Sequence, residues 1–580
     1  MSDISDGADP GAAGGAPATG GSGTAGNTGS SDPPPPPASG STPSPTPTSA
    51  ASPNQGLALA AMMFAVSMTF IDQTIVAVAA PDISDELNLS SSGLRWVVNA
   101  YLLALAATFA LGGRLADIHG HRRVMLAGTL IFVTASVLCG CVPATGFAQT
   151  WMIIFRAVQG VGAALLFPAA LAVVVAVFPV ERRGRALALF FGVAGGLTAI
   201  GPLLGGWLTA WTWRAIFWVN VPVALIAIVL TLLARIPNVV RRERLDLPGA
   251  VLVAAGMGLS VLGLQQAAEW GWGSAATWSC IIGGFALLVA FCAYELRYPE
   301  HPLINLRVFR DRAFFVDNAV LFFAMLAFVP LFFFASVYAQ VSLGKTPNEA
   351  ALYLLYFFLG FVVASQIGGR LLDGRGARFP MVLGSALGAA GFALWAWKMT
   401  DLSVGAQWPY VVLAGAGIGF VLAPASTDSV NRAIDASYGE VTGITQTVRN
   451  YAAAVGLAVF GTVLSHVTVD KVAATLESRG VPPGAADDAA RGVSQAVAAH
   501  GGGHRPTGDG PVATALREAG DAVRMDFAEA NQWVFYGMAI ALVVSFACAL
   551  THPGTRVTAT TPPRESERSR KGERMVPEQE

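Results

Sequence analysis

The sequence reads Leu-Gly-Gly-Arg-Leu-Ala-Asp-Ile-His-Gly at residues 111–120 and Ile-Gly-Gly-Arg-Leu-Leu-Asp-Gly-Arg-Gly at residues 367–376. Six positions match at a constant offset of 256: Gly112, Gly113, Arg114, Leu115, Asp117 and Gly120 correspond to Gly368, Gly369, Arg370, Leu371, Asp373 and Gly376. Pro168 and Pro424 keep the same offset. The sequence therefore predicts two halves that share one topology.

Around these stretches the chain alternates apolar runs with short polar segments. Hydrophobic residues make up 53% of the 580 residues, and charged residues make up 13%, about half of the fraction expected for a soluble protein. An apolar run of about 20 residues spans a bilayer as a helix. Fourteen such runs are predicted, at 57–79, 94–113, 122–142, 151–177, 184–208, 214–234, 247–267, 276–296, 314–340, 350–372, 379–398, 408–426, 443–466 and 533–551.

This pattern predicts an all-α polytopic membrane protein with two six-helix bundles and two additional central helices, 14 transmembrane helices in total. Many secondary transporters consist of parallel halves with the substrate path between them. The composition excludes an ordinary soluble enzyme and a disordered scaffold. The net charge of −1 leaves no basic excess for binding nucleic acid.

The basic residues predict the orientation. If the N-terminus is cytoplasmic, the loops on that side hold 18 Lys and Arg and the short loops on the other side hold 4, which fits the positive-inside rule with both termini cytoplasmic. The predicted segments are a disordered Gly/Ala/Pro/Ser-rich tail at 1–55, a six-helix bundle at 56–235, two central helices at 236–298, a second bundle at 299–551 with a long extracellular loop at 467–532, and a charged tail at 552–580.

Three motifs lie inside predicted spans. The first span ends in Asp72-Gln73-Thr74-Ile75-Val76, and a carboxylate inside an apolar helix is costly and by default functional. The fourth span carries Arg156 and Gln159, which share one helix face. The fifth span contains Gly201-Pro202-Leu203-Leu204-Gly205-Gly206, where the proline bends the helix and the glycines allow close packing.

Together with the loop residues Gly113, Asp117, Gly120, Arg122 and Arg123, these motifs resemble the 14-span drug:proton antiporters of the major facilitator superfamily, the EmrB/QacA-like group. The resemblance covers about residues 56–466 and the last span. It implies that the loop motif latches a cytoplasmic gate, that Asp72 and Arg156 couple transport to protons, and that the Gly-Pro motif marks an exporter. Ile118 stands where the family often has Arg. The repeated copy of the gate motif consists of Gly369, Asp373 and Gly376.

Structural roles remain the alternatives at this stage. Asp72 would then be a hydrogen-bond acceptor near the outer interface, and Arg156 would belong to a buried structural ion pair. Thr74, Gln159, Asp317 and Arg449 are the candidates for the transport path. For Asp317 and Arg449, helix-capping or interface roles are the stronger interpretation.

The sequence thus predicts a proton-coupled exporter of amphipathic small molecules in a plasma membrane. Arginine outnumbers lysine 32 to 4, which favours a bacterial source. The nearest alternative is a dedicated exporter of an endogenous metabolite or a self-made antibiotic, and the remote alternative is a non-transporting membrane sensor or channel. We expect no enzyme activity, no metal site, and no cofactor besides the proton gradient. We expect a monomer whose partners are a small molecule, protons and the lipid bilayer, without nucleic acid.

Overall fold

The computed structural model describes residues 54–89, 91–236, 240, 245–298, 303–304, 306–432, 438–500 and 519–554. Most of both predicted tails, 1–55 and 552–580, lies outside the described residues.

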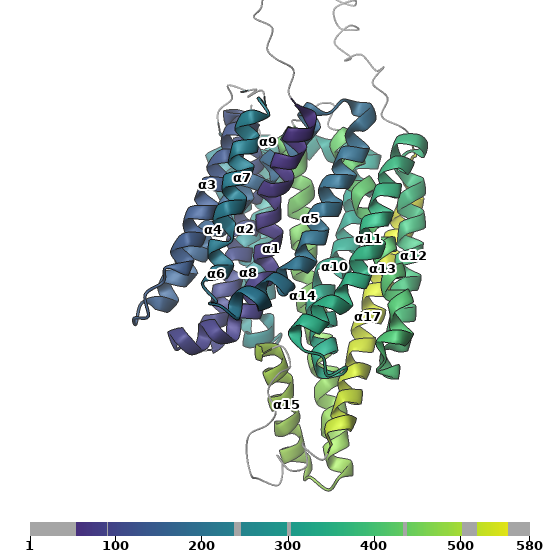
Figure 1. The fold of residues 1–580 in the computed structure, drawn as a ribbon. Helices are drawn as coiled ribbons and strands as arrows, with labels where there is room; N and C mark the ends of the chain where they lie inside the picture. Colours follow the sequence, from purple (N-terminus) through teal and green to yellow (C-terminus); the bar gives the residue numbers. More distant parts are fainter. Residues whose placement is uncertain are drawn as a thin grey trace, which may run out of the picture. The chain divides into compact units, whose positions relative to one another are not determined.

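Helices make up nearly all of the described residues, and no strand occurs among them (Figure 1). A helix satisfies its backbone hydrogen bonds internally, as a membrane interior requires. The helices are α1 (Gln55–Leu87), α2 (Ser91–His119), α3 (His121–Gly140), α4 (Ala148–Val177), α5 (Val180–Thr209), α6 (Ala215–Trp218), α7 (Asn220–Leu233), α8 (Leu247–Trp270), α9 (Ala275–Arg297), η1 (Leu306–Arg310), α10 (Arg312–Val341), α11 (Pro347–Arg375), α12 (Arg378–Lys398), η2 (Met399–Asp401), α13 (Val404–Asn431), α14 (Tyr438–Ser478), α15 (Pro483–His500) and α17 (Gly520–Leu550).

Local signals set several helix ends. Asn54 and Asp246 cap the starts of α1 and α8 by accepting hydrogen bonds from backbone N–H groups of the first turn. Gly120 (φ 93°) and Gly376 (φ 81°) form the turns between α2 and α3 and between α11 and α12. Positive φ favours glycine at both places. The repeated sequence stretch therefore builds the same sharp turn twice.

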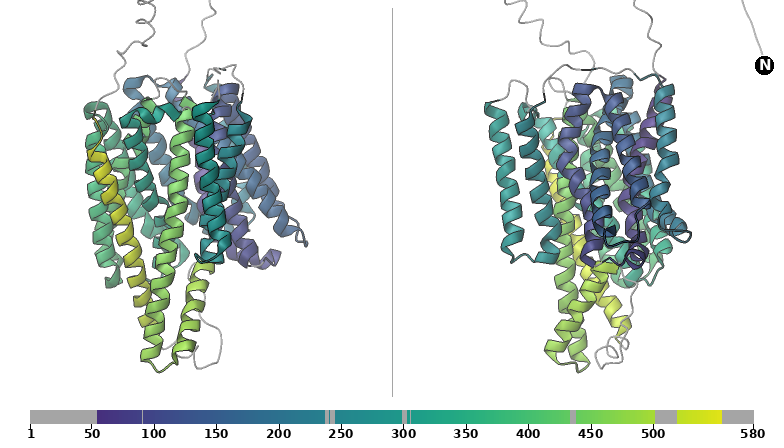
Figure 2. Two further views of the ribbon diagram at one scale, coloured as in Figure 1. Left: turned by 180° about the vertical axis from the view of Figure 1, so that it is seen from behind. Right: turned by 90° about the vertical axis from the view of Figure 1, so that its left-hand side faces the viewer.

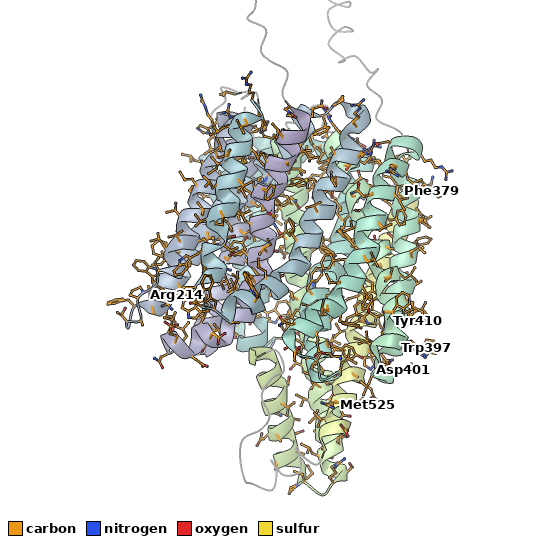
Figure 3. All side chains as sticks on the ribbon, viewed as in Figure 1. Arg214, Phe379, Trp397, Asp401, Tyr410 and Met525 are labelled. Atoms are coloured by element: carbon orange, nitrogen blue, oxygen red, sulfur yellow. The ribbon has the colours of Figure 1, made fainter. Side chains whose placement is uncertain are left out.

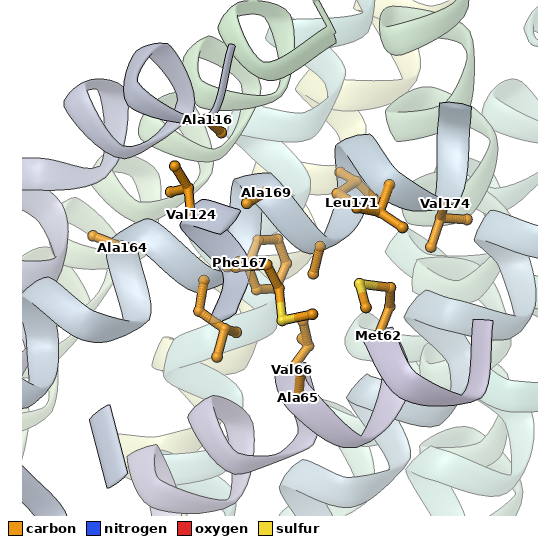
Figure 4. Packing of buried hydrophobic residues seen from close by; sticks show 14 of the residues in the cluster. Met62, Ala65, Val66, Ala116, Val124, Ala164, Phe167, Ala169, Leu171 and Val174 are labelled. Atoms are coloured by element: carbon orange, nitrogen blue, oxygen red, sulfur yellow. The ribbon is translucent and has the colours of Figure 1, made fainter. Parts of the chain in front are cut away.

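Each half has its own hydrophobic core. In the first, Phe167 of α4 packs in a cluster with Met62 and Val66 of α1 (Figure 4). In the second, Phe392 and Trp395 of α12 pack with residues of α10, α11, α13 and α17. This division matches the two bundles that the repeat predicts.

The halves meet chiefly where α2 packs against α14 and α5 packs against α11. A Cβ atom placed on Gly192 of α5 would lie 2.9 Å from Oγ of Ser365, and one on Gly206 would lie 2.5 Å from Oδ1 of Asn348. Asn348 lies at the start of α11, and Ser365 lies about two-thirds of the way along it. Glycine therefore lets α5 and α11 approach each other closely at two separate levels.

The two additional helices are central in the sequence but peripheral in the structure. α8 packs against α2 and α14, one helix from each half, and α9 packs against α8. Only 17% of the apolar window of α9 is buried. The pair thus covers the outside of the α2–α14 contact, at one edge of the bundle (Figure 2, right).

Thirteen helices of the described part are long and apolar enough to cross a membrane, with α6 and α7 counted as one span. They coincide with thirteen of the fourteen predicted runs. The remaining run, 184–208, forms α5, which has sufficient length but has several side chains outside the described part. The total of fourteen spans stays a prediction.

α1 begins and α17 ends at the same end of the bundle (Figures 1 and 2). Phe379, at the start of α12, lies toward this end, whereas Arg214 and Asp401 lie toward the opposite end (Figure 3). The helices thus alternate in direction as the predicted topology requires. The side that faces the cytoplasm stays a prediction.

The segment 467–532, predicted as a long extracellular loop, is mainly helical in its described parts, and its extracellular position stays a prediction. α14 continues to Ser478, α15 follows it, and α17 begins at Gly520. The extended ends of α14 and α17 are joined by Lys471 and Glu529, whose Nζ and Oε2 lie 2.6 Å apart. Alternating alanines and charged residues suit a helix as well as a loop when a neighbouring helix supplies partners for the charges.

Candidate functional site

Asp72 of α1 and Arg156 and Gln159 of α4 form a closed hydrogen-bond network. Nη1 of Arg156 donates to Oδ2 of Asp72 (2.5 Å) and to Oε1 of Gln159 (2.7 Å). Nε2 of Gln159 donates to Oδ1 of Asp72 (2.9 Å). The three residues are at most 1% exposed. The structure thus places the two predicted proton-coupling residues in direct contact, while their role in coupling stays a prediction.

Helix α2 completes the surroundings of this network. Nε of Arg156 donates to the carbonyl oxygen of Val97 (3.2 Å), and its Cζ lies 4.6 Å from the ring centre of Tyr101. The hydroxyl of Tyr101 donates to the carbonyl oxygen of Thr69 (3.4 Å). Sequence reasoning missed Val97 and Tyr101. A role played by a backbone carbonyl cannot be recognised from the residue type, and a tyrosine in an apolar run is only a weak indication of a functional role.

The network holds one negative and one positive charge, both buried and both hydrogen-bonded. Buried charges are tolerated when they are paired, and removing one partner leaves the other uncompensated. A carboxylate can accept a proton, whereas a guanidinium keeps its charge. Protonation of Asp72 would therefore remove the negative charge of the pair and leave the charge of Arg156 uncompensated. This is chemistry suited to a proton-operated switch.

A cavity of about 60 Å³ lies between the two halves. Gln73, the next residue after Asp72, lines it. The wall consists of apolar and aromatic side chains, four polar ones and one arginine, from α1, α2, α4, α10 and α14: Thr69, Phe70, Gln73, Leu105, Phe109, Ala163, Phe167, Met325, Phe328, Val329, Gln446, Arg449 and Asn450. Pockets for drug-sized ligands measure roughly 300–1,000 Å³. A substrate of that size thus requires the halves to separate.

Arg449, one of the predicted transport-path residues, lines this cavity. Its Nε and Nη1 atoms are buried and have no hydrogen-bond partner. Its Cζ lies 5.1 Å from the ring centre of Phe191. Among the described residues no carboxylate pairs with it. The guanidinium is thus held by an aromatic ring but not neutralised.

The glycines of the Gly-Pro motif allow α5 to pack closely against α1 and α11. A Cβ atom on Gly201 would overlap with Oγ1 of Thr74 on α1, so only glycine fits there. Gly205 is buried, and Gly206 faces Asn348 of α11. Pro202 lies within α5, and its side chain is outside the described part. Thr74 therefore lies at the α1–α5 contact rather than on the cavity wall, and its role in the transport path stays a prediction.

The first copy of the gate motif lies at the contact between the halves. Asp117 is 3% exposed, and its Oδ1 lies 3.8 Å from Nε2 of His121. A Cβ atom on Gly443 of α14 would lie 3.8 Å from Cα of Gly113. The motif end of α2 therefore packs directly against α14. Arg122 is half-buried and Arg123 is exposed at the start of α3.

The second copy of the motif has the same turn but a different environment. Gly369 and Gly376 are buried, whereas Asp373 is exposed. Asp117, its counterpart, is buried. The repeat therefore conserves the backbone of the turn and not the setting of its carboxylate. Whether either copy latches a gate stays a prediction.

Asp317 lies away from the cavity, in a buried cluster where α10 begins and α13 and α17 end. Nε2 of His552 lies 3.5 Å from Oδ1 of Asp317 and 3.3 Å from Oδ2 of Asp428. Nε of Arg432 donates to Oδ2 of Asp428 (2.6 Å). The predicted charged tail 552–580 begins at His552, which is buried in the structure (1% exposed). Its position after the last apolar run concealed the contact.

Asp317, Asp428 and His552 also form the one group with metal-ligand spacing found among the described residues. Nδ1 of His552 accepts a hydrogen bond from the N–H of Gly554 (3.1 Å). In the neutral ring the proton therefore sits on Nε2, facing the carboxylates, where a metal would need a lone pair. At the offset of 256, the two carboxylates correspond to the buried residues Ala61 and Ala172, so the first half has no equivalent.

A second ion pair ties α1 to the segment before α6, at the end of the bundle where Arg214 lies (Figure 3). Nη1 of Arg214 donates to Oε1 of Glu86 (2.5 Å), and Nε1 of Trp213 donates to Oε2 (2.6 Å). The bonds from Arg214 and Trp213 hold the pKa of Glu86 below its ordinary value. Sequence reasoning missed Glu86, whose partners lie far away in the chain.

Comparison with known proteins gives a consistent family assignment. The family model described as Major Facilitator Superfamily matches residues 62–457. The cephamycin export protein CmcT of Amycolatopsis lactamdurans is 37% identical over 427 residues, which cover 71% of this chain and 86% of that protein. The puromycin resistance protein pur8 of Streptomyces alboniger is 33% identical, covering 77% and 88%. The tetracenomycin C resistance and export protein of Streptomyces glaucescens is 32% identical, covering 70% and 75%.

Among solved structures, a bacterial homologue of the human lysosomal transporter Spinster matches 87% of this chain and 99% of its own, with a TM-score of 0.51 and 17% identity. The proton:xylose symporter XylE matches 87% and 97%, with a TM-score of 0.50 and 12% identity. At these identities the likeness concerns the fold alone.

Proposed function

Because the chain belongs to the Major Facilitator Superfamily, we propose that this multi-pass membrane protein is a proton-coupled exporter of amphipathic small molecules. The observation that carries the proposal is the Asp72–Arg156–Gln159 network beside a cavity between two halves. At the offset of 256 the two charges correspond to Phe328 and Val412. The scaffold is duplicated, whereas the charge pair occurs once, as expected for residues that perform chemistry rather than build the fold.

In the proposed cycle, substrate reaches the cavity from the cytoplasm or the inner leaflet while Asp72 is ionised and paired with Arg156. The halves then rock along the α2–α14 and α5–α11 contacts, and the substrate leaves on the other side. A proton from outside neutralises Asp72 and releases Arg156. Loss of this proton to the cytoplasm restores the ion pair and resets the carrier.

Two observations support export rather than import: the Gly-Pro motif of α5 and the relatives, which are named for export or resistance. A second candidate function is dedicated export of a self-made antibiotic. The cephamycin and tetracenomycin C export proteins favour it, because each is named for one compound. We further propose that the protein works as a monomer and needs no cofactor besides the proton gradient. A sensor or channel would leave the buried Asp72–Arg156 pair without a use.

The test compares wild type with Asp72→Asn in everted membrane vesicles. We expect Asp72→Asn to lose proton-driven accumulation of a fluorescent dye and to keep exchange of labelled for unlabelled dye, because exchange needs no net proton transfer. Asp85→Asn is the matched control, since Asp85 is an exposed carboxylate on the same helix. Full proton-driven accumulation by Asp72→Asn would show that the coupling site lies elsewhere.

A further inference from the structure

Resting on the proposed function, we infer that the exported molecules carry an anionic group, in its simplest form a carboxylate, that binds to Arg449 in the cavity between the halves. The position of the cavity does not by itself indicate which molecules bind there. Two buried arginines do, because Arg156 has a carboxylate partner and Arg449 has none among the described residues.

Arg156 shows how this protein neutralises a buried arginine. Its guanidinium has a carboxylate, an amide oxygen and a backbone carbonyl as acceptors, and the carboxylate balances its charge. Arg449 has no such set. Its Nε and Nη1 find no acceptor, and the nearby ring of Phe191 attracts the charge without accepting a conventional hydrogen bond.

A guanidinium stays charged in proteins, so Arg449 does not escape the cost of burial by losing its proton. Buried charges need a partner. Since no described residue supplies one, the partner is a molecule that enters the cavity. A carboxylate fits best, because its two oxygens match the planar row of guanidinium N–H donors.

The rest of the cavity wall agrees with this assignment. Arg449 is the one charged residue among the thirteen that line the cavity, so the formal charge of the wall is positive. Gln73, Gln446 and Asn450 add neutral amide groups on both sides of the contact between the halves. A cationic drug would meet repulsion here without any carboxylate to offset it, and an anion would meet attraction strengthened by the low local dielectric.

The other residues of the cavity wall indicate the chemical character of the rest of the substrate. Phe70, Phe109, Phe167 and Phe328 supply aromatic surface from three helices of the first half and one of the second. Aromatic and apolar groups pack favourably there. The expected substrate is therefore an amphipathic anion, with an apolar or aromatic body and one carboxylate.

The experiment measures binding of three small probes to the purified full-length protein in lipid nanodiscs by equilibrium dialysis, without a proton gradient. 2-Naphthylacetate is the anion, 2-naphthylacetamide has the same shape without charge, and 2-(2-naphthyl)ethylammonium is the cation. The variants are Arg449→Gln, which removes the charge, and Arg449→Lys, which keeps it. Arg524→Gln is the control, because it removes an exposed arginine outside the cavity.

Wild type and Arg524→Gln are expected to bind the carboxylate about 10–100-fold more tightly than the amide, the range for one charge-assisted hydrogen-bonded contact. Arg449→Gln should lose this preference while its affinity for the amide changes less than about twofold. Arg449→Lys should retain part of it. Equal or weaker binding of the carboxylate than of the amide or the ammonium by wild type, or an equal loss of all probes in Arg449→Gln, would overturn the inference.

The proposed function is judged by a separate measurement. Proton-driven uptake of the carboxylate probe into everted vesicles requires coupling, whereas the binding preference does not. Intact preference without proton-driven uptake would contradict the exporter proposal and leave the anion site standing. Proton-driven uptake of the ammonium probe but not of the carboxylate probe would support the exporter proposal and contradict the anion site.

Discussion

Removing either charge of the Asp72–Arg156 pair should cost more stability than removing both. In Asp72→Asn, Arg156 keeps the amide oxygen of Gln159 (2.7 Å) and the carbonyl of Val97 (3.2 Å). In Arg156→Gln, the ionised carboxylate keeps only the amide N–H of Gln159 (2.9 Å). Breaking one side of a buried pair costs about 3–5 kcal/mol. We expect Asp72→Asn near the lower end of this range and Arg156→Gln near the upper end.

The double variant Asp72→Asn/Arg156→Gln leaves no buried charge, and its amide groups can hydrogen-bond with Gln159. We expect it to be more stable than either single variant, which with single losses of about 3 and 5 kcal/mol requires a coupling of more than about 5 kcal/mol against the sum of the single changes. Thermal unfolding of the purified proteins, followed by tryptophan fluorescence at a fixed pH, measures the cycle. Strictly additive losses would refute the claim that these two charges stabilise each other.

Three further outcomes are expected. Gly201→Ala should lower stability by about 1–3 kcal/mol through overlap with Thr74, and Thr74→Ala should restore part of it; no rescue in a thermal unfolding assay would contradict the close contact. The low pKa of Glu86 means that its bond with Arg214 stabilises the fold above about pH 4.5 and that this contribution is lost as the pH falls through the folded pKa. Glu86→Gln should therefore cost at most about 1 kcal/mol at pH 7, since the pair is half-exposed, and this cost should shrink as the pH is lowered through the folded pKa; a cost that does not change with pH would argue against the pair. Asp317→Asn should leave the KM for substrate within about twofold, because Asp317 does not line the cavity; a larger rise in transport assays would place it on the path.

Much of the fold was predictable because the membrane restricts what a chain can do. Apolar runs must become helices in lipid, and the two copies of the Gly-Gly-Arg stretch fixed the correspondence between the halves. The extension of α14 to Ser478 was not predictable, because alanines and charges in segment 467–532 are compatible with loop and helix alike. The helix that supplies partners for these charges is α17, whose Glu529 lies 58 residues after Lys471.

The site was predictable where charge alone gave the signal. Asp72 and Arg156 are conspicuous because they are charged residues in apolar helices. Their direct contact could not be predicted, because it depends on how α1 packs against α4. The lack of a partner for Arg449 could not be read from the sequence, because it is a property of everything that surrounds the side chain. His552 was missed for the opposite reason, since its surroundings are formed by three helix ends that are remote in sequence.

Helix α14 is 41 residues long, which corresponds to about 60 Å, twice the thickness of a bilayer core. Arg449 lies in its first third, and the helix continues from there for about 44 Å to Ser478. A tilt of the helix by about 10° around Arg449 would displace its C-terminal end by about 8 Å. A spin label or fluorophore near Ser478 would therefore report the proposed rocking of the halves through a displacement enlarged by the length of the helix.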